Sequence, residues 1–137
     1  YGMTDGEYAM TAAVVAGIMV IVGHNWPVIY RFKGGKGVAA SLGVMLAATP
    51  LIGLGGFAIA AISVLLTNYM SIGSMAGALF AFVLCLIVEP LPIKLLSLAV
   101  LLLDVFQHRS NIKRLINGVE NPMMSQSLLE RIMGKKR

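Results

Sequence analysis

The stretch Gly23-His24-Asn25-Trp26-Pro27-Val28-Ile29-Tyr30-Arg31-Phe32-Lys33-Gly34-Gly35-Lys36-Gly37-Val38 separates two apolar parts of the chain and decides how it is organised. It holds three cations and four glycines. Glycine lets backbone N–H groups approach a ligand closely, and a helix that begins at Gly37 or Val38 would point its positive end at the loop. These features indicate a phosphate-binding loop at a membrane surface. A solvated basic loop between two helices is the plainer interpretation, and the residues alone leave both open.

The composition indicates an all-α integral membrane protein with a single domain over residues 1–137. The chain is 58% hydrophobic and 12% charged, whereas soluble domains carry about 25% charged residues. The net charge of +5 comes from residues in loops between apolar segments, which favours anionic lipid headgroups over nucleic acid as partners. Cys85 lies within an apolar segment and is expected to serve packing.

Five apolar segments are predicted to cross the membrane, at about 8–23, 38–49, 51–66, 72–88 and 93–107. The first two are short, because a full crossing needs about 20 residues. Thr4 or Asp5 is expected to cap the first helix, and Pro27 and Pro50 are expected to separate the first three helices. The small residues of the third segment predict close helix packing.

The distribution of charge predicts an orientation. Five crossings would place the loop at 31–36, the turn at 67–71 and the C-terminal tail at 121–137 on one side of the membrane. That side holds ten of the eleven cations, and Lys94 is the exception. The positive-inside rule then places this side in the cytoplasm. The end of the tail, at 125–137, fits either a short interfacial helix or a disordered segment.

Two patterns resemble the signatures of a known family. The pattern Gly-His-x-x-Pro-x-x-x-x-Phe-Lys-Gly-Gly-Lys-Gly-Val-Ala, at 23–39, resembles the second signature of the bacterial acyl-phosphate:glycerol-3-phosphate acyltransferases, the PlsY family. His108-Arg109-Ser110-Asn111-Ile112-Lys113-Arg114-Leu115, followed by Gly118 and Glu120, is similar to the third signature. The family fold has seven spans. The chain, which begins Tyr1-Gly2-Met3, is therefore expected to lack the N-terminal part that carries the first signature, and this piece alone is not expected to be fully active.

The resemblance implies transfer of a fatty acyl group from acyl phosphate to the 1-hydroxyl of sn-glycerol 3-phosphate, which gives lysophosphatidate for phospholipid synthesis. It implies a multi-pass protein of the bacterial inner membrane that needs no metal, no CoA and no other cofactor. The sequence has no His-x-x-x-x-Asp motif, because Ile29 and Lys113 stand five residues after the two histidines. CoA-dependent acyltransferases built on that motif are therefore disfavoured. A membrane anion transporter and a non-catalytic membrane subunit are the alternatives.

Lysines and the third signature supply the candidate site. Lys33 and Lys36 present compact charges that suit phosphates, and His108 and Asn111 lie three residues apart on one face of a predicted helix. The segment Tyr69-x-Ser71-Ile72-Gly73-Ser74 resembles a less stringent family stretch, although Asn68 stands where many members have a basic residue. The predicted catalytic residues are Lys36, His108 and Asn111. The predicted substrate-binding residues are Lys33, Gly34, Gly35, Gly37, His24, Ser74 and Arg109.

Asp104 is the one acidic residue near the end of an apolar segment. It precedes His108 by four residues, and a carboxylate that orients an imidazole is a familiar arrangement. An acid within a span is costly and usually paired. The sequence therefore favours a structural ion pair between Asp104 and Arg109 or another cation.

Overall fold

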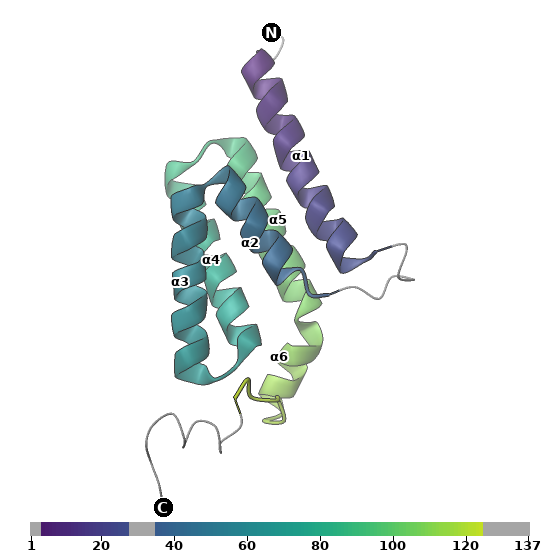
Figure 1. Ribbon diagram of the computed structural model, residues 1–137, viewed down its shortest axis with the longest axis vertical. Helices are drawn as coiled ribbons and strands as arrows, with labels where there is room; N and C mark the ends of the chain where they lie inside the picture. The colour runs from purple at the N-terminus through teal and green to yellow at the C-terminus, as the bar shows by residue number, and fades with distance from the viewer. Residues whose placement is uncertain (1–3, 28–34, 125–137) are drawn as a thin grey trace, which may run out of the picture.

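The computed structural model describes residues 4–27 and 35–124. The predictions for Lys33, Gly34 and the end of the tail at 125–137 lie outside these residues. Within them, the regular structure consists of α-helices (Figure 1), and the bounds are α1 Asp5–Asn25, α2 Val38–Ala48, α3 Pro50–Thr67, α4 Met70–Val88, α5 Leu91–Gln107 and α6 Arg109–Ile116.

The first helix begins at a capping box, as the sequence predicts. The Thr4 hydroxyl accepts a hydrogen bond from the Glu7 backbone N–H, and the Glu7 carboxylate accepts one from the Thr4 N–H at 2.7 Å. This pair satisfies N–H groups that the first turn leaves without helical partners. Most of α1 is exposed, and it buries Val14, Ile21 and Asn25. The helix therefore presents a long apolar surface on its outer side.

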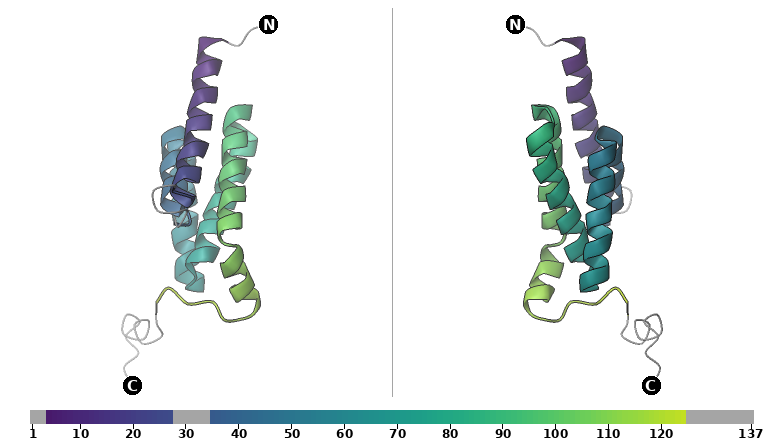
Figure 2. Two further views of the ribbon diagram at one scale, coloured as in Figure 1. Left: turned by 90° about the vertical axis from the view of Figure 1, so that its right-hand side faces the viewer. Right: turned by 90° about the vertical axis from the view of Figure 1, so that its left-hand side faces the viewer.

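Helices α1 to α5 alternate in direction (Figure 1). The end of α1, the start of α2, the turn between α3 and α4, and the end of α5 lie toward the same end of the bundle. Figure 2 shows α6 continuing beyond α5 at this end, at an angle to it. The described parts of both signatures therefore lie toward one end, as predicted, while the side of the membrane that this end faces stays a prediction.

Helix length and hydropathy give three or four candidate spans in the described residues, fewer than the five that the sequence predicts. Within residues 4–27 and 35–124, three helices are long and apolar enough to cross a membrane, namely α1, α3 and α4. Helices α5 and α6 give a fourth candidate as a pair bent by 56°. Helix α2 has 11 residues, or about 16 Å at 1.5 Å per residue, which is shorter than a bilayer core of about 30 Å. Five spans, and a family fold of seven, therefore stay predictions.

The bend after α5 differs from the helix expected through the third signature. His108 has φ −91° and ψ 6°, and the helix is interrupted there before α6 begins. The residues after the bend include Arg109, Lys113 and Arg114, which an apolar environment would not accommodate. The bend turns this polar helix away from the axis of α5 while keeping Asn111 buried.

Helices α3 and α4 pack closely through glycines. A Cβ atom on Gly77 would lie 2.5 Å from the backbone oxygen of Gly56, and one on Gly73 would lie 2.7 Å from that of Ala60. Only glycine permits this separation of the two backbones, as is common where helices pack in lipid. The close packing expected of the third apolar segment is thus confirmed.

Candidate active site

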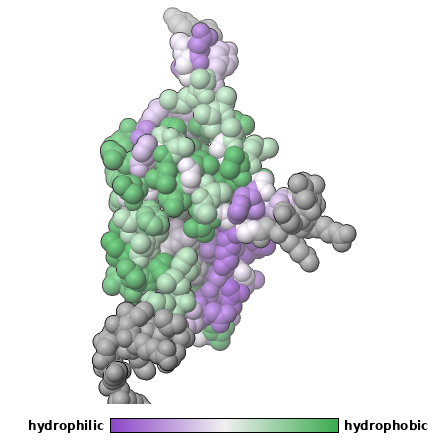
Figure 3. Space-filling view, in the orientation of Figure 1, coloured by the Kyte–Doolittle hydropathy of each residue, from purple (hydrophilic) through white to green (hydrophobic). Residues whose placement is uncertain are grey.

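An apolar groove runs between α2, α3, α4 and α5. It encloses a volume of about 80 Å³ and has few polar lining groups, which include Ser41, Ser74 and Asp104. Its other lining residues are apolar or glycine: Val38, Leu42, Met45, Gly53, Gly56, Phe57, Ala60, Gly77, Ala78, Ala81 and Val100. In Figure 3 the surface over the helices is largely hydrophobic, and a hydrophilic patch lies over α6. The groove therefore joins an apolar interior to a polar end.

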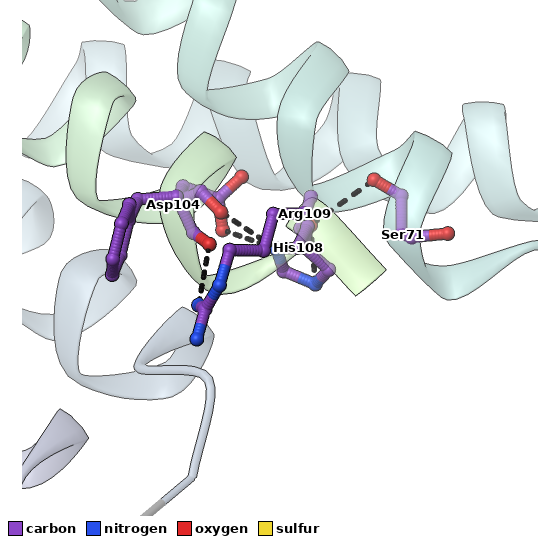
Figure 4. A network of polar contacts seen from close by, with 6 residues as sticks. Ser71, Asp104, His108 and Arg109 are labelled. Atoms are coloured by element: carbon purple, nitrogen blue, oxygen red, sulfur yellow. Dashed lines mark hydrogen bonds and ion pairs between the residues drawn. The ribbon is translucent and has the colours of Figure 1, made fainter. Parts of the chain in front are cut away.

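His108 lies buried at that end and connects α5 to α4 (Figure 4). Its ring Nδ1 lies 2.9 Å from the backbone oxygen of Asp104 and 3.3 Å from the carboxylate Oδ1 of the same residue. Its ring Nε2 lies 3.4 Å from the hydroxyl of Ser74, which can also donate to the backbone oxygen of Ser71 at 3.3 Å. The predicted site residues Ser74 and His108 are thus in contact.

The predicted ion pair between Asp104 and Arg109 is wrong. The carboxylate of Asp104 contacts His108, while the Arg109 guanidinium lies 4.4 Å from the centre of the Phe106 ring and donates to the Phe106 backbone oxygen at 2.9 Å. Residues four apart on a helix share a face, whereas residues five apart do not, and the bend at His108 turns Arg109 further outward. Arg109 is exposed, and it forms a cation–π contact in place of an ion pair.

Glu120 forms hydrogen bonds with two polar residues of α6. Its Oε1 accepts a hydrogen bond from the amide of Asn111, and its Oε2 accepts one from the Arg114 guanidinium at 2.7 Å. The hydrogen bond from Arg114 is the main cause that lowers the pKa of Glu120 from 4.5, with smaller contributions from Asn111 and from the charges of Arg114 and Lys36. Lys36 is therefore close enough for its charge to act on this cluster.

The Glu120 cluster predicts a loss of stability in acid. Because the folded pKa lies below the unfolded value, the carboxylate stabilises the fold fully above about pH 4.5 and loses this contribution as the pH falls through the folded pKa. The midpoint of thermal unfolding in detergent micelles, measured from pH 7 down to about pH 3, should fall less steeply for Glu120→Gln than for the unchanged chain. Glu89→Gln is the matched control, because Glu89 forms no ion pair with a described residue. An equal fall of the unfolding midpoint with decreasing pH in all three proteins would contradict the pairing of Glu120 with Asn111 and Arg114.

The start of α2 lies against the end of α1. Gly37 is the N-cap of α2 with φ 77°, and no side chain caps the free N–H groups of the first turn. A Cβ atom on Gly37 would overlap the buried carboxamide of Asn25, and one on Gly35 would lie 3.0 Å from Nε2 of His24. The predicted residues His24, Gly35 and Gly37 are therefore brought together where the positive end of α2 is exposed.

Several buried polar atoms here have no hydrogen-bond partner among the described residues. They are Oδ2 of Asp104, Oδ1 of Asn111, the hydroxyl of Ser71 and both polar atoms of the Asn25 carboxamide. Buried polar atoms in folded proteins are normally paired, so such a concentration at one end of a groove is typical of a place that receives polar ligand groups. Sequence reasoning missed both Asn25, which is an unspecified position of its signature, and Ser71, which is a specified position of the less stringent stretch but received no predicted role.

Asn68 has a structural role. It ends α3 in the left-handed conformation at φ 63°, and its carboxamide exchanges hydrogen bonds of 2.8 and 2.9 Å with the backbone of Met124. Its backbone oxygen accepts a third bond from the N–H of Met123. These bonds fasten the segment after α6 to the turn between α3 and α4, so no charged contact is needed at this position.

Comparisons with known proteins identify the family of the chain. Residues 3–118 match the family model described as glycerol-3-phosphate acyltransferase. The glycerol-3-phosphate acyltransferase of Thermoanaerobacter sp. strain X514 is 45% identical over 121 residues, 86% of this chain and 61% of that protein. The one from Synechococcus elongatus is 46% identical over 128 residues, 93% of this chain and 60% of that protein. The chain thus spans about three fifths of the length of these curated relatives.

The fold also matches a solved structure. The crystal structure of PlsY, an integral membrane glycerol 3-phosphate acyltransferase, in its glycerol 3-phosphate form superposes with a TM-score of 0.82 at 29% identity, over 90% of this chain and 64% of that one. Its lysophosphatidic acid form gives a TM-score of 0.80 at 30% identity, over 85% of this chain and 61% of that one. Both sequence and fold therefore lead to one conclusion: the chain belongs to the glycerol-3-phosphate acyltransferase family.

Proposed function

We propose that this chain forms the catalytic membrane domain of an enzyme that moves a fatty acyl group from acyl phosphate to the 1-hydroxyl of sn-glycerol 3-phosphate. The products are lysophosphatidate and phosphate. One observation carries the proposal: the apolar groove ends at Ser74 and Asp104, which both contact His108. An apolar groove that ends at a polar cluster suits a reaction that joins a fatty acyl group to a polar acceptor.

The groove suits the acyl chain. On α4 its lining extends from Ser74 to Ala81, a rise of about 10 Å along the helix. Each methylene group removed from water there contributes about 0.8 kcal/mol. Because the lining is mainly apolar, the groove is a poor path for an anion, which disfavours the alternative of an anion transporter.

The polar end suits sn-glycerol 3-phosphate. Lys36, Arg114 and the free N–H groups of α2 supply positive charge for phosphate. The unpaired Oδ1 of Asn111 is an acceptor, and a glycerol hydroxyl is a donor that would satisfy it. The crystal forms of PlsY with glycerol 3-phosphate and lysophosphatidic acid support this choice of substrate and product.

The reaction is a direct acyl transfer. The hydroxyl oxygen attacks the acyl carbonyl carbon, the bond from that carbon to the phosphate oxygen breaks, and the phosphate leaves with the electron pair. A phosphate of the substrates takes the hydroxyl proton. Lys36 and the N–H groups at the start of α2 stabilise the negative charge that develops, while Nε2 of His108 and the hydroxyl of Ser74 orient the attacking group. Asn111 holds a second hydroxyl.

The cation asymmetry supports a position of this active end at the cytoplasmic face of a bacterial inner membrane. The substrates and membrane lipids are then its partners, and acyl-CoA is not a donor. The relatives' names give the acyl acceptor but not the acyl donor. The identity of the donor is therefore tested directly.

The donor test uses radiolabelled glycerol 3-phosphate in lipid vesicles with either palmitoyl phosphate or palmitoyl-CoA. The chain is assayed alone and as a chimera that carries the preceding part of the Thermoanaerobacter relative, which serves as the positive control. We expect labelled lysophosphatidate with palmitoyl phosphate only. Turnover of palmitoyl-CoA at a comparable rate would refute the proposed donor. Absence of transfer by both the chain and the chimera, beside an active relative, would refute the proposed enzyme.

A further inference from the structure

Asp104 is a buried acid to which the proposed reaction assigns no proton transfer. We propose that it is a positioning residue, which holds the imidazole of His108 so that ring Nε2 faces Ser74 and the polar end of the groove. The kinetic part of this proposal rests on the proposed function, whereas its structural part does not.

The first argument is the cost of the acid. Asp104 is 3% exposed and lies on an otherwise apolar helix. A buried carboxyl group is strongly unfavourable unless it is paired. Among the described residues, the ring of His108 is the only side chain that pairs with it, since Arg109 contacts Phe106. The burial of Asp104 is therefore compensated by His108 alone.

The second argument is the direction of the hydrogen bonds. Ring Nδ1 of His108 faces two oxygens of Asp104, the backbone carbonyl at 2.9 Å and Oδ1 at 3.3 Å. A carbonyl and a carboxylate only accept hydrogen bonds, so Nδ1 carries a proton, and in the neutral ring Nε2 then keeps its lone pair. Nε2 then stands as an acceptor 3.4 Å from the Ser74 hydroxyl, where it can receive a hydrogen bond from an attacking hydroxyl.

The third argument is why the carbonyl alone is insufficient. The backbone oxygen of Asp104 already accepts the backbone N–H of His108 at 3.0 Å, and the helix is interrupted at His108. Because this oxygen is shared between the backbone N–H and the ring of His108, at a point where the helix bends, it fixes the orientation of the imidazole only weakly. The carboxylate adds an acceptor from a second direction, which disfavours both a flipped ring and the other tautomer.

The test combines nitrogen NMR with kinetics on Asp104→Leu and Asp104→Asn. The chain has two histidines, so ¹⁵N-histidine labelling of the full chain in nanodiscs gives few signals, and exposed His24 is an internal reference. We expect His108 to be protonated at Nδ1. In Asp104→Leu its Nδ1–H signal should move upfield, exchange faster with water and show a mixture of tautomers, while the His24 signals stay unchanged.

In the transfer assay, Asp104→Leu should lower kcat by about 10- to 100-fold, the range for outer partners of metal-ligating histidines. The KM for glycerol 3-phosphate should stay within about twofold, because the residue acts through His108 on the chemical step. Asp104→Asn should lose less, since its amide oxygen can still accept from Nδ1–H. Ser97→Ala is the matched control, because Ser97 is another buried polar residue of α5, and it should leave both kcat and the His108 signals unchanged.

Two results would overturn the proposal. One is a set of His108 signals that Asp104→Leu and Asp104→Asn leave unaltered. The other is a raised KM with an unchanged kcat, which would make Asp104 a substrate contact. If neither the unchanged chain nor its chimera transfers an acyl group, the proposed function fails, and the NMR signals still decide whether Asp104 positions His108. If Asp104→Leu does not fold, the isosteric Asp104→Asn supplies the comparison.

Discussion

Replacement of Lys36 by alanine should lower kcat/KM for acyl transfer by about 10² to 10³, the cost of removing one preorganised donor from a developing negative charge. Lys36 is exposed at the start of α2, and its charge reaches the Glu120 cluster of α6. Lys36 therefore directly precedes the free N–H groups of α2 and adds positive charge that acts on the third signature. Lys36→Arg should restore little activity, because a planar guanidinium does not replace a compact ammonium group.

The matched control is Lys94→Ala. Lys94 lies in the first turn of α5, at the other end of the bundle, and its removal changes the net charge by the same amount. It should leave the rate unchanged. Both variants should insert and elute from size-exclusion chromatography as the unchanged protein does. Full activity of Lys36→Ala in the transfer assay would rule out a role for this lysine in binding the phosphates.

The second large effect is expected from Gly37→Ala, which should lower the transfer rate about 100-fold, the cost of displacing catalytic groups by about 1 Å. Gly37 has φ 77°, a conformation that costs an L-residue roughly 1–2 kcal/mol. The added methyl group would also overlap the Asn25 carboxamide. The start of α2 must then shift, and with it Lys36 and the N–H groups that face the phosphates.

Gly43→Ala is the control for this variant, since Gly43 lies in the same helix and a Cβ atom there would meet nothing within 4 Å. It should retain the full rate. The comparison is made in the transfer assay with circular dichroism to confirm equal helix content. If Gly37→Ala and Gly43→Ala were equally active, the fit between α1 and the start of α2 would have no part in catalysis.

The helices could be predicted because local sequence determines them. Apolar segments, prolines and the cap at Thr4 gave the ends of most helices to within a few residues, and the start of α2 at Val38 followed from Gly37. The bend at His108 was not predictable in this way, because a helix can continue through every residue of that segment. Its cause is the change of surroundings from an apolar helix to the polar residues of α6.

Contacts in the site could be predicted where both residues lie on one face of a helix, but not where a turn brings the two residues together. Asp104 and His108 are four residues apart, and their contact follows from helix geometry, but a general preference for ion pairs favoured Arg109 in the sequence analysis. The approach of Glu120 to Asn111 depends on the turn at Gly118, with φ 68°. No pattern in the sequence specifies that the carboxamide of Asn25 lies against Gly37.

The measurement that tests the account most directly is photolabelling with an acyl phosphate that carries a diazirine near the middle of its chain. The central claim is that the groove and the polar end form one active site. We expect label on groove residues such as Met45 and Ala78, and little on the outward-facing Leu54 and Leu86. Glycerol 3-phosphate added before illumination should reduce the label and yield photoreactive lysophosphatidate. Equal labelling of both sets of residues, unaffected by glycerol 3-phosphate, would contradict the account.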